Sequence, residues 1–295
     1  MGFRAEASGD TLSVQQVDNV NASIRYYDLT PKALVTTFTS GSATNTFLGV
    51  AQKIENGTKL LSGYTITISF KIYSVIPRDI SIEYRQNFGV GGSPVSNGLN
   101  QSPNISLAAG WNTVEYTHTL PVLTNQTITD SNALWAIIWL STGSAQPINL
   151  GIQPDGAIQL SAVQVVMGAN AKPFIYTPIG ETLTLCQRYY EKSYNQSTFA
   201  GDATTIGATY LAAQVTATGT WAVPTYFKVP KRVDPAVETY SAVTGAINTI
   251  SVGNVDVPRT ILQPSQTGFI AYADPVVLAN VGSAIQFNWT ADAEL

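Results

Sequence analysis

The chain of 295 residues is 44% hydrophobic and only 12% charged, a composition that suits β-sheets with polar, uncharged outer faces. Its net charge of −4 argues against a nucleic-acid partner, because binding to phosphates requires a cationic surface. A single cysteine excludes an intramolecular disulfide, and no apolar run approaches the roughly 20 residues of a membrane-spanning helix. We therefore expect no membrane insertion, and the length suits one large domain or two ordinary ones.

Alternating apolar and polar residues predict a series of strands in the first part of the chain. The clearest is at 64–73, where every second residue is apolar, and 80–88 alternates in the same way. Residues 134–140 are almost continuously apolar, as is typical of a strand covered on both faces. Further candidates are 3–28, 35–38, 46–54, 111–120, 148–152 and 158–167. Closely spaced strands without intervening helices predict a sandwich or jelly roll over residues 1–177.

The only convincing helical pattern in the sequence follows this series of strands. Leu183, Cys186 and Tyr190 recur at helical spacing, and Glu181 near the start favours the helix dipole. The pattern predicts a short helix at about 181–192 that joins two β domains, with Cys186 as a buried structural thiol.

A second set of strand candidates follows the predicted helix. They lie at 207–217, 221–229, 236–240, 247–252, 268–272 and 283–289. They predict a second, smaller β-sandwich domain at 178–295, opened by the helix. Its weakly charged sheets are easier to explain if copies of the chain pack together, so this domain is the expected site of oligomerisation.

Three motifs carry a resemblance to a known family. They are Pro173-Phe174 followed by GETLTLCQRYY at 180–190, the loop QNFGVGGSP at 86–94, and FNWTADAEL at 287–295. The chain resembles bacteriophage and prophage tail-fibre-like structural proteins, in which a jelly-roll module similar to carbohydrate-binding modules precedes a small β domain. The resemblance implies a tail-fibre-like or receptor-binding protein of the virion, made in the host bacterial cytoplasm. It also implies a homotrimer that contacts other virion proteins and host surface glycans.

Two other functions stay open at this stage. A capsid decoration or head-fibre protein on the capsid lattice could share the same fold. A polysaccharide depolymerase needs only two carboxylates, and the 19 acidic residues are scattered along the chain. The single histidine, His118, lies on an alternating strand and is expected to face outward. With one histidine and one cysteine in all, we expect no catalytic residues, no cofactor and no metal site of the zinc type.

Aromatic residues make sugar recognition the favoured mode of binding. The chain has 14 Tyr and 5 Trp, and an aromatic ring can stack on the apolar face of a pyranose while amide side chains bond its hydroxyls. The candidate ligand-binding residues are Tyr26, Tyr27, Tyr84, Gln86, Asn87 and Trp111. Four other tryptophans lie in apolar strands and are expected in the core: Trp135, Trp139, Trp221 and Trp289.

Overall fold

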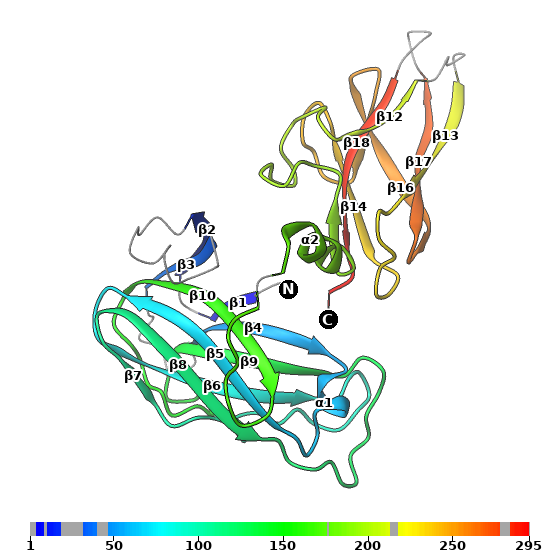
Figure 1. Cartoon of the computed structure of the whole chain (residues 1–295). Helices are drawn as coiled ribbons and strands as arrows, with labels where there is room; N and C mark the ends of the chain where they lie inside the picture. The colour runs from blue at the N-terminus through cyan, green and yellow to red at the C-terminus, as the bar shows by residue number, and fades with distance from the viewer. Residues whose placement is uncertain are drawn as a thin grey trace. The chain divides into compact units, whose positions relative to one another are not determined.

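The computed structural model describes residues 4–8, 11–18, 32–39, 47–175, 177–212, 218–277 and 284–294. The chain divides into two compact units, Met1–Thr177 (unit 1) and Pro178–Glu294 (unit 2). Antiparallel strands are the main regular structure of both units (Figure 1), so the predicted all-β class with a jelly-roll sandwich is confirmed.

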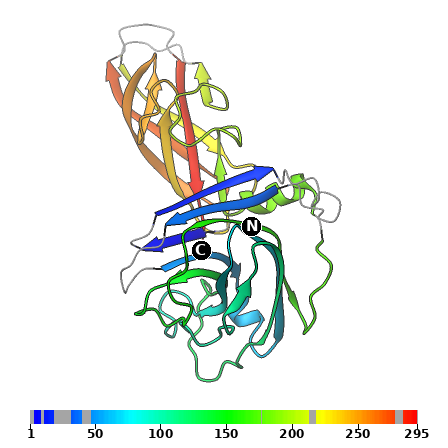
Figure 2. The ribbon, with the colours of Figure 1, turned by 90° about the vertical axis from the view of Figure 1, so that its left-hand side faces the viewer.

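Unit 1 is a sandwich of two five-stranded sheets (Figure 2). Sheet A has the order β1 (Arg4–Ser8), β4 (Phe47–Glu55), β9 (Ala133–Thr142), β6 (Arg78–Asn87) and β7 (Ile105–Leu107). Sheet B has the order β2 (Thr11–Asp18), β3 (Lys32–Thr39), β10 (Gly156–Met167), β5 (Thr65–Ser74) and β8 (Gly110–Thr119). A short helix, α1 (Gly57–Leu60), follows β4. Residues 148–152 form no strand, which corrects that prediction.

The alternation of side chains explains why these sequences form a sandwich. Even-numbered residues of β5, β6 and β9, such as Ile66, Ile82 and Leu134, are fully buried between the sheets. Each such side chain contributes about 1.5–3 kcal/mol by leaving water. Odd-numbered residues of β9 face the other side of sheet A, where Ile148 and Leu150 pack on Ile137. The segment predicted as a strand thus covers the outer face instead.

Unit 2 is built around its last strand, β18 (Ala284–Asp292). One edge of β18 pairs with β11 (Tyr190–Lys192) and β12 (Thr209–Ala212), and the other edge pairs with β14 (Ala236–Ser241) and β15 (Thr249–Val252). The sheet continues through β16 (Val255–Ser265) and β17 (Gly268–Val277) to β13 (Thr218–Tyr226). A single eight-stranded sheet therefore encloses the core of unit 2, which includes Phe287 and Trp289.

The helix of unit 2 is shorter than predicted. α2 spans Ile179–Gln187, whereas 190–192 form strand β11. A buried ion pair of 2.6 Å between Glu191 and Lys231, together with pairing to β18, outweighs the helical propensity of these residues. Cys186 is only half-buried and no residue of α2 is buried, which corrects the expectation of a buried thiol. Among the described residues, no helix is long and apolar enough to cross a membrane.

Strand β16 was not predicted because prolines interrupt its pattern. Pro258 and Pro264 lie inside the strand, and proline is normally confined to edges and bulges. The register with β17 indeed shifts between Leu262 and Ser265, and Gln263 between them has a positive φ of 50°. An irregularity in the ladder thus accommodates the second proline.

Candidate functional site

An open depression lies on the outer face of sheet A, the face turned away from sheet B. The space between and above its lining atoms is about 350 Å³ when open solvent is included, so it is a shallow surface feature and not an enclosed cavity. Its walls and floor come from strands β4, β6 and β9 and consist of Phe47, Gly49, Ala51, Lys53, Arg85, Trp135, Ile137 and Trp139. We call it the outer depression.

Strand register brings these residues together. Three rows of opposed residues cross β4, β9 and β6: Gly49, Trp139 and Ser81; Ala51, Ile137 and Glu83; Lys53, Trp135 and Arg85. Small residues on β4 create the hollow, since a Cβ added to Gly49 would lie 3.1 Å from Cε3 of Trp139. The rows span roughly 13 Å, four residues at the rise of a strand.

Two cations flank the indole of Trp135. Lys53 Nζ lies 4.6 Å from the centroid of this ring, and the guanidinium carbon of Arg85 lies 5.8 Å from it. The same carbon is 5.5 Å from the centroid of Trp139, whose ring meets Phe47 edge-on at 5.9 Å. Cation–π attraction therefore holds both cations against the aromatic floor.

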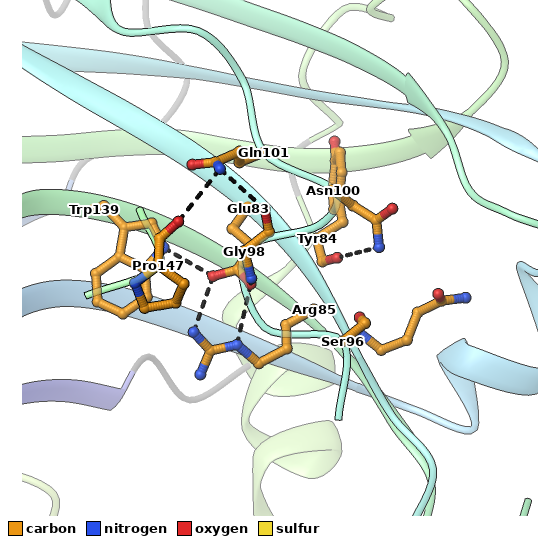
Figure 3. A network of polar contacts seen from close by, with 10 residues as sticks. Glu83, Tyr84, Arg85, Ser96, Gly98, Asn100, Gln101, Trp139 and Pro147 are labelled. Atoms are coloured by element: carbon orange, nitrogen blue, oxygen red, sulfur yellow. Dashed lines mark hydrogen bonds and ion pairs between the residues drawn. The ribbon is translucent and has the colours of Figure 1, made fainter. Parts of the chain in front are cut away.

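The buried carboxylate of Glu83 fixes this arrangement (Figure 3). Its Oε1 accepts hydrogen bonds from Arg85 Nε (3.2 Å) and from the backbone N–H of Gly98 (2.7 Å). Its Oε2 accepts from Arg85 Nη2 (2.9 Å) and from Trp139 Nε1 (3.0 Å). The Glu83 side chain is 0% exposed while that of Arg85 is 16% exposed. Such charge-assisted, bidentate contacts are strong and hold both partners in one geometry.

A loop is anchored to the same carboxylate. Gly98 has a positive φ of 68°, and a Cβ on it would lie 2.8 Å from Cβ of Pro147. Gln101 Nε2 donates to the carbonyl oxygens of Gly98 (2.9 Å) and Pro147 (3.4 Å), as Figure 3 shows. The loops that contain Gly98 and Pro147 are thereby joined to the floor of the outer depression.

Two of the three predicted ligand residues on β6 are buried, and none of the three lines the outer depression. Tyr84 is 0% exposed and stacks on Tyr116 between the sheets, with 5.8 Å between ring centroids. Gln86 is also buried, and Asn87 is half-buried with its Oδ1 accepting from the N–H of Gly89. Tyr84 and Gln86 are even-numbered residues of β6, which face the core, whereas Arg85 faces the outer depression. Asn87 shares the parity of Arg85 but does not line the outer depression.

The other predicted ligand residues lie elsewhere. Trp111 is half-buried on the outer face of sheet B, where it packs on Tyr73 at 5.5 Å, so it lies on the opposite side of the sandwich from the outer depression. Tyr26 and Tyr27 lie outside the described residues. Of the four predicted ligand residues that the structure describes, Trp111 therefore lies apart from the three on β6.

The two tryptophans of β9, both expected in the core, differ in burial. Trp139 is buried with Ile148 and Leu150 as predicted, although it also lines the outer depression, whereas Trp135 is only partly buried. Trp289 is buried in unit 2 as predicted, and the side chain of Trp221 lies outside the described part. Because β9 is apolar at both parities, its own sequence does not show which face is open. The small residues Gly49 and Ala51 at alternate positions of the neighbouring strand were the available signal.

His118 does not face outward as expected. It lies on the inner face of β8 and is half-buried, with its ring 5.9 Å from that of Tyr116 and 6.3 Å from that of Tyr84. Its Nδ1 is 3.1 Å from the hydroxyl of Tyr116, and burial lowers the pKa of the imidazole. In the part of the chain that the structure describes, no group of three or more His, Cys, Asp or Glu could hold a metal ion.

No protein-family model and no curated protein matches the sequence. Among solved structures, the chain is similar to a family 11 carbohydrate-binding module from Clostridium thermocellum in complex with a β-1,3-1,4-mixed-linked tetrasaccharide (14% identity, 58% of this chain, 91% of that chain, TM-score 0.35). It is also similar to the CBM22-1 xylan-binding domain of Paenibacillus barcinonensis Xyn10C (14%, 57%, 87%, 0.34) and to tailspike protein 4 of bacteriophage CBA120 (10%, 56%, 19%, 0.33). With TM-scores below 0.5, these likenesses establish no ligand for this chain.

Proposed function

We propose that the protein is a non-catalytic glycan-binding protein and that the outer depression of unit 1 holds the sugar. The observation that carries this proposal is the half-exposed indole of Trp135 beside Arg85, whose guanidinium is held by the buried Glu83. The apolar face of a pyranose ring packs on such an indole, and the N–H groups of Lys53 and Arg85 can bond its hydroxyls.

The chemistry of the outer depression favours binding over hydrolysis. None of the described residues that line it is Asp or Glu. The carboxylate beneath it, Glu83, already accepts four hydrogen bonds. A glycosidase needs a pair of carboxylates on either side of the scissile bond, one of which donates a proton. The outer depression instead offers an aromatic ring on which a sugar can pack and N–H groups that can donate hydrogen bonds to it.

The finer proposal places this sugar-binding surface on a bacteriophage virion. Its support is the resemblance of three sequence motifs to tail-fibre-like proteins, and the proposed ligand is then a glycan of the host surface. Unit 2 would form the contacts of a homotrimer, and its exposed aromatic side chains, Phe199 and Tyr226 at 78% each, are suited to contacts between copies. Light scattering of the full chain should give three times the monomer mass, and a monomer would overturn the trimer. Antibody labelling of virions should mark the tail; labelling of the capsid would favour a decoration protein instead.

Substitution of Trp135 tests the binding site. A glycan array with the full chain identifies a bound oligosaccharide, and its affinity is then measured by isothermal titration calorimetry. Trp135→Ala should cost about 2 kcal/mol, or roughly thirtyfold in affinity, as for a central aromatic contact. The matched control is Trp111→Ala on sheet B, which should leave the affinity unchanged. The site is refuted if the folded Trp135→Ala protein binds as tightly as the unmodified chain.

A further inference from the structure

We propose that the outer depression selects an acidic oligosaccharide and holds a carboxylate-bearing sugar over Trp135, between Lys53 and Arg85. This inference rests on the proposed function, since it names the class of glycan that the same surface takes. Three features carry it: the uneven distribution of charge along the outer depression, the exposure of the Glu83–Arg85 pair, and the donors that Arg85 keeps.

Charge is confined to one end of the outer depression. The row of Gly49 and Trp139, with Phe47 beside it, contains no charged residue. Roughly 13 Å away, the row of Lys53 and Arg85 places two cations on either side of one indole. A matching ligand therefore places its anionic substituent at the row of Lys53 and Arg85.

The Glu83–Arg85 pair presents its positive member to the ligand. The Glu83 side chain is 0% exposed, whereas the Arg85 side chain is 16% exposed and lines the outer depression. An incoming ligand therefore meets the guanidinium and not the carboxylate. The chain as a whole carries a net charge of −4. In contrast, the charged residues found among the described lining of the outer depression, Lys53 and Arg85, are both cations. Glu83 offsets one of these two positive charges from beneath, so the exposed side of the outer depression still presents positive charge to an anion.

Arg85 also keeps the donors that a carboxylate needs. A guanidinium has five N–H groups, and Glu83 engages one on Nε and one on Nη2. The remaining N–H groups can donate to a ligand from a guanidinium that is already held by an ion pair and two indoles. Since its geometry is fixed before binding, less conformational entropy is lost when the ligand binds.

Matched oligosaccharides test this inference. The full chain is titrated with neutral, uronate-containing and sulfated oligosaccharides of equal length, each at low and high salt. The uronate-containing set should bind at least about tenfold more tightly than the neutral set, as expected for hydrogen bonds to a charged group. This preference should shrink at high salt, because ions screen a partly exposed pair.

A variant that removes one of the two cations tests whether the preference for acidic sugars arises in the outer depression. Lys53→Gln should weaken uronate binding by up to about fivefold more than it weakens neutral binding, the limit for an exposed ion pair. Lys71→Gln, which removes a charge from β5 in sheet B, is the control and should alter neither affinity. Equal affinity for neutral and uronate-containing sugars would overturn the acidic-glycan inference and leave the glycan-binding function intact. Tighter binding of sulfated sugars would overturn the carboxylate assignment, and no binding to any set would overturn the proposed function itself.

Discussion

Replacing Glu83 by glutamine should both destabilise unit 1 and weaken sugar binding. Each carboxylate oxygen of Glu83 accepts one N–H of Arg85 and one further donor, either Gly98 N–H or Trp139 Nε1. In Glu83→Gln, one oxygen becomes an NH₂ group, so two donors face another donor. A hydrogen bond to a charged group contributes about 1.5–3 kcal/mol. Since Arg85 is 16% exposed and water can replace part of its loss, we expect about 3 kcal/mol.

Calorimetry and ligand titration together measure this effect. A loss of about 3 kcal/mol should lower the melting temperature of unit 1 by roughly 6–12 °C, the scaling for a domain of this size. The affinity for the bound glycan should fall in the same variant, because Trp139 and Arg85 are no longer held. Glu115→Gln, which changes an exposed carboxylate on β8, is the control and should stay within about 0.5 kcal/mol. A change below about 1 kcal/mol for Glu83→Gln would refute the organising role of this carboxylate.

Three further predictions concern other parts of the chain. Lys231→Met should destabilise unit 2 by about 3–5 kcal/mol in urea denaturation, because the buried carboxylate of Glu191 loses its cationic partner. Lys228→Met, at an exposed position, is the control and should have little effect. Gly98→Ala should cost more stability than Gly91→Ala, since both have positive φ but only Gly98 has a close neighbour; equal costs would contradict the contact. Burial lowers the pKa of His118 below 6.5, so the folded protein favours the neutral imidazole; the resulting stabilisation is complete above pH 6.5 and declines below it. In His118→Gln, the melting temperature should no longer show this decline at low pH. An unchanged pH profile of the melting temperature would contradict the assignment to His118.

Periodicity in the sequence predicted the strands of unit 1 because one face of each strand is covered and the other is not. The prediction failed where the alternation between a covered and an uncovered face is lost. Strand β16 contains Pro258 and Pro264, which interrupt its alternating pattern. The early end of the helix and the start of strand β11 depend on a buried contact between Glu191 and Lys231, which are 40 residues apart in the sequence. Such contacts are set by the tertiary fold and leave no local pattern.

The candidate site was missed for a related reason. Trp135 and Trp139 belong to a run that is apolar at both parities, so the run predicts burial without showing that one face lies open in a hollow. The hollow depends on the register that sets Gly49 beside Trp139, and on Glu83, which contacts Trp139 across 56 positions of sequence. Neither the register nor the pairing can be obtained from a single strand.

The placement of the outer depression on strands has consequences for how a ligand binds. Lys53, Trp135 and Arg85 are directly opposed on three neighbouring strands of one sheet, and the loop at Gly98 is bonded to the carboxylate that holds Arg85. The bonds that stabilise the fold therefore also fix the geometry of the binding residues. A surface of this kind should change little on binding, so bound and free structures should agree closely in the backbone of sheet A. The affinity would then depend on how well the ligand matches the indole and the two cations rather than on rearrangement of the protein.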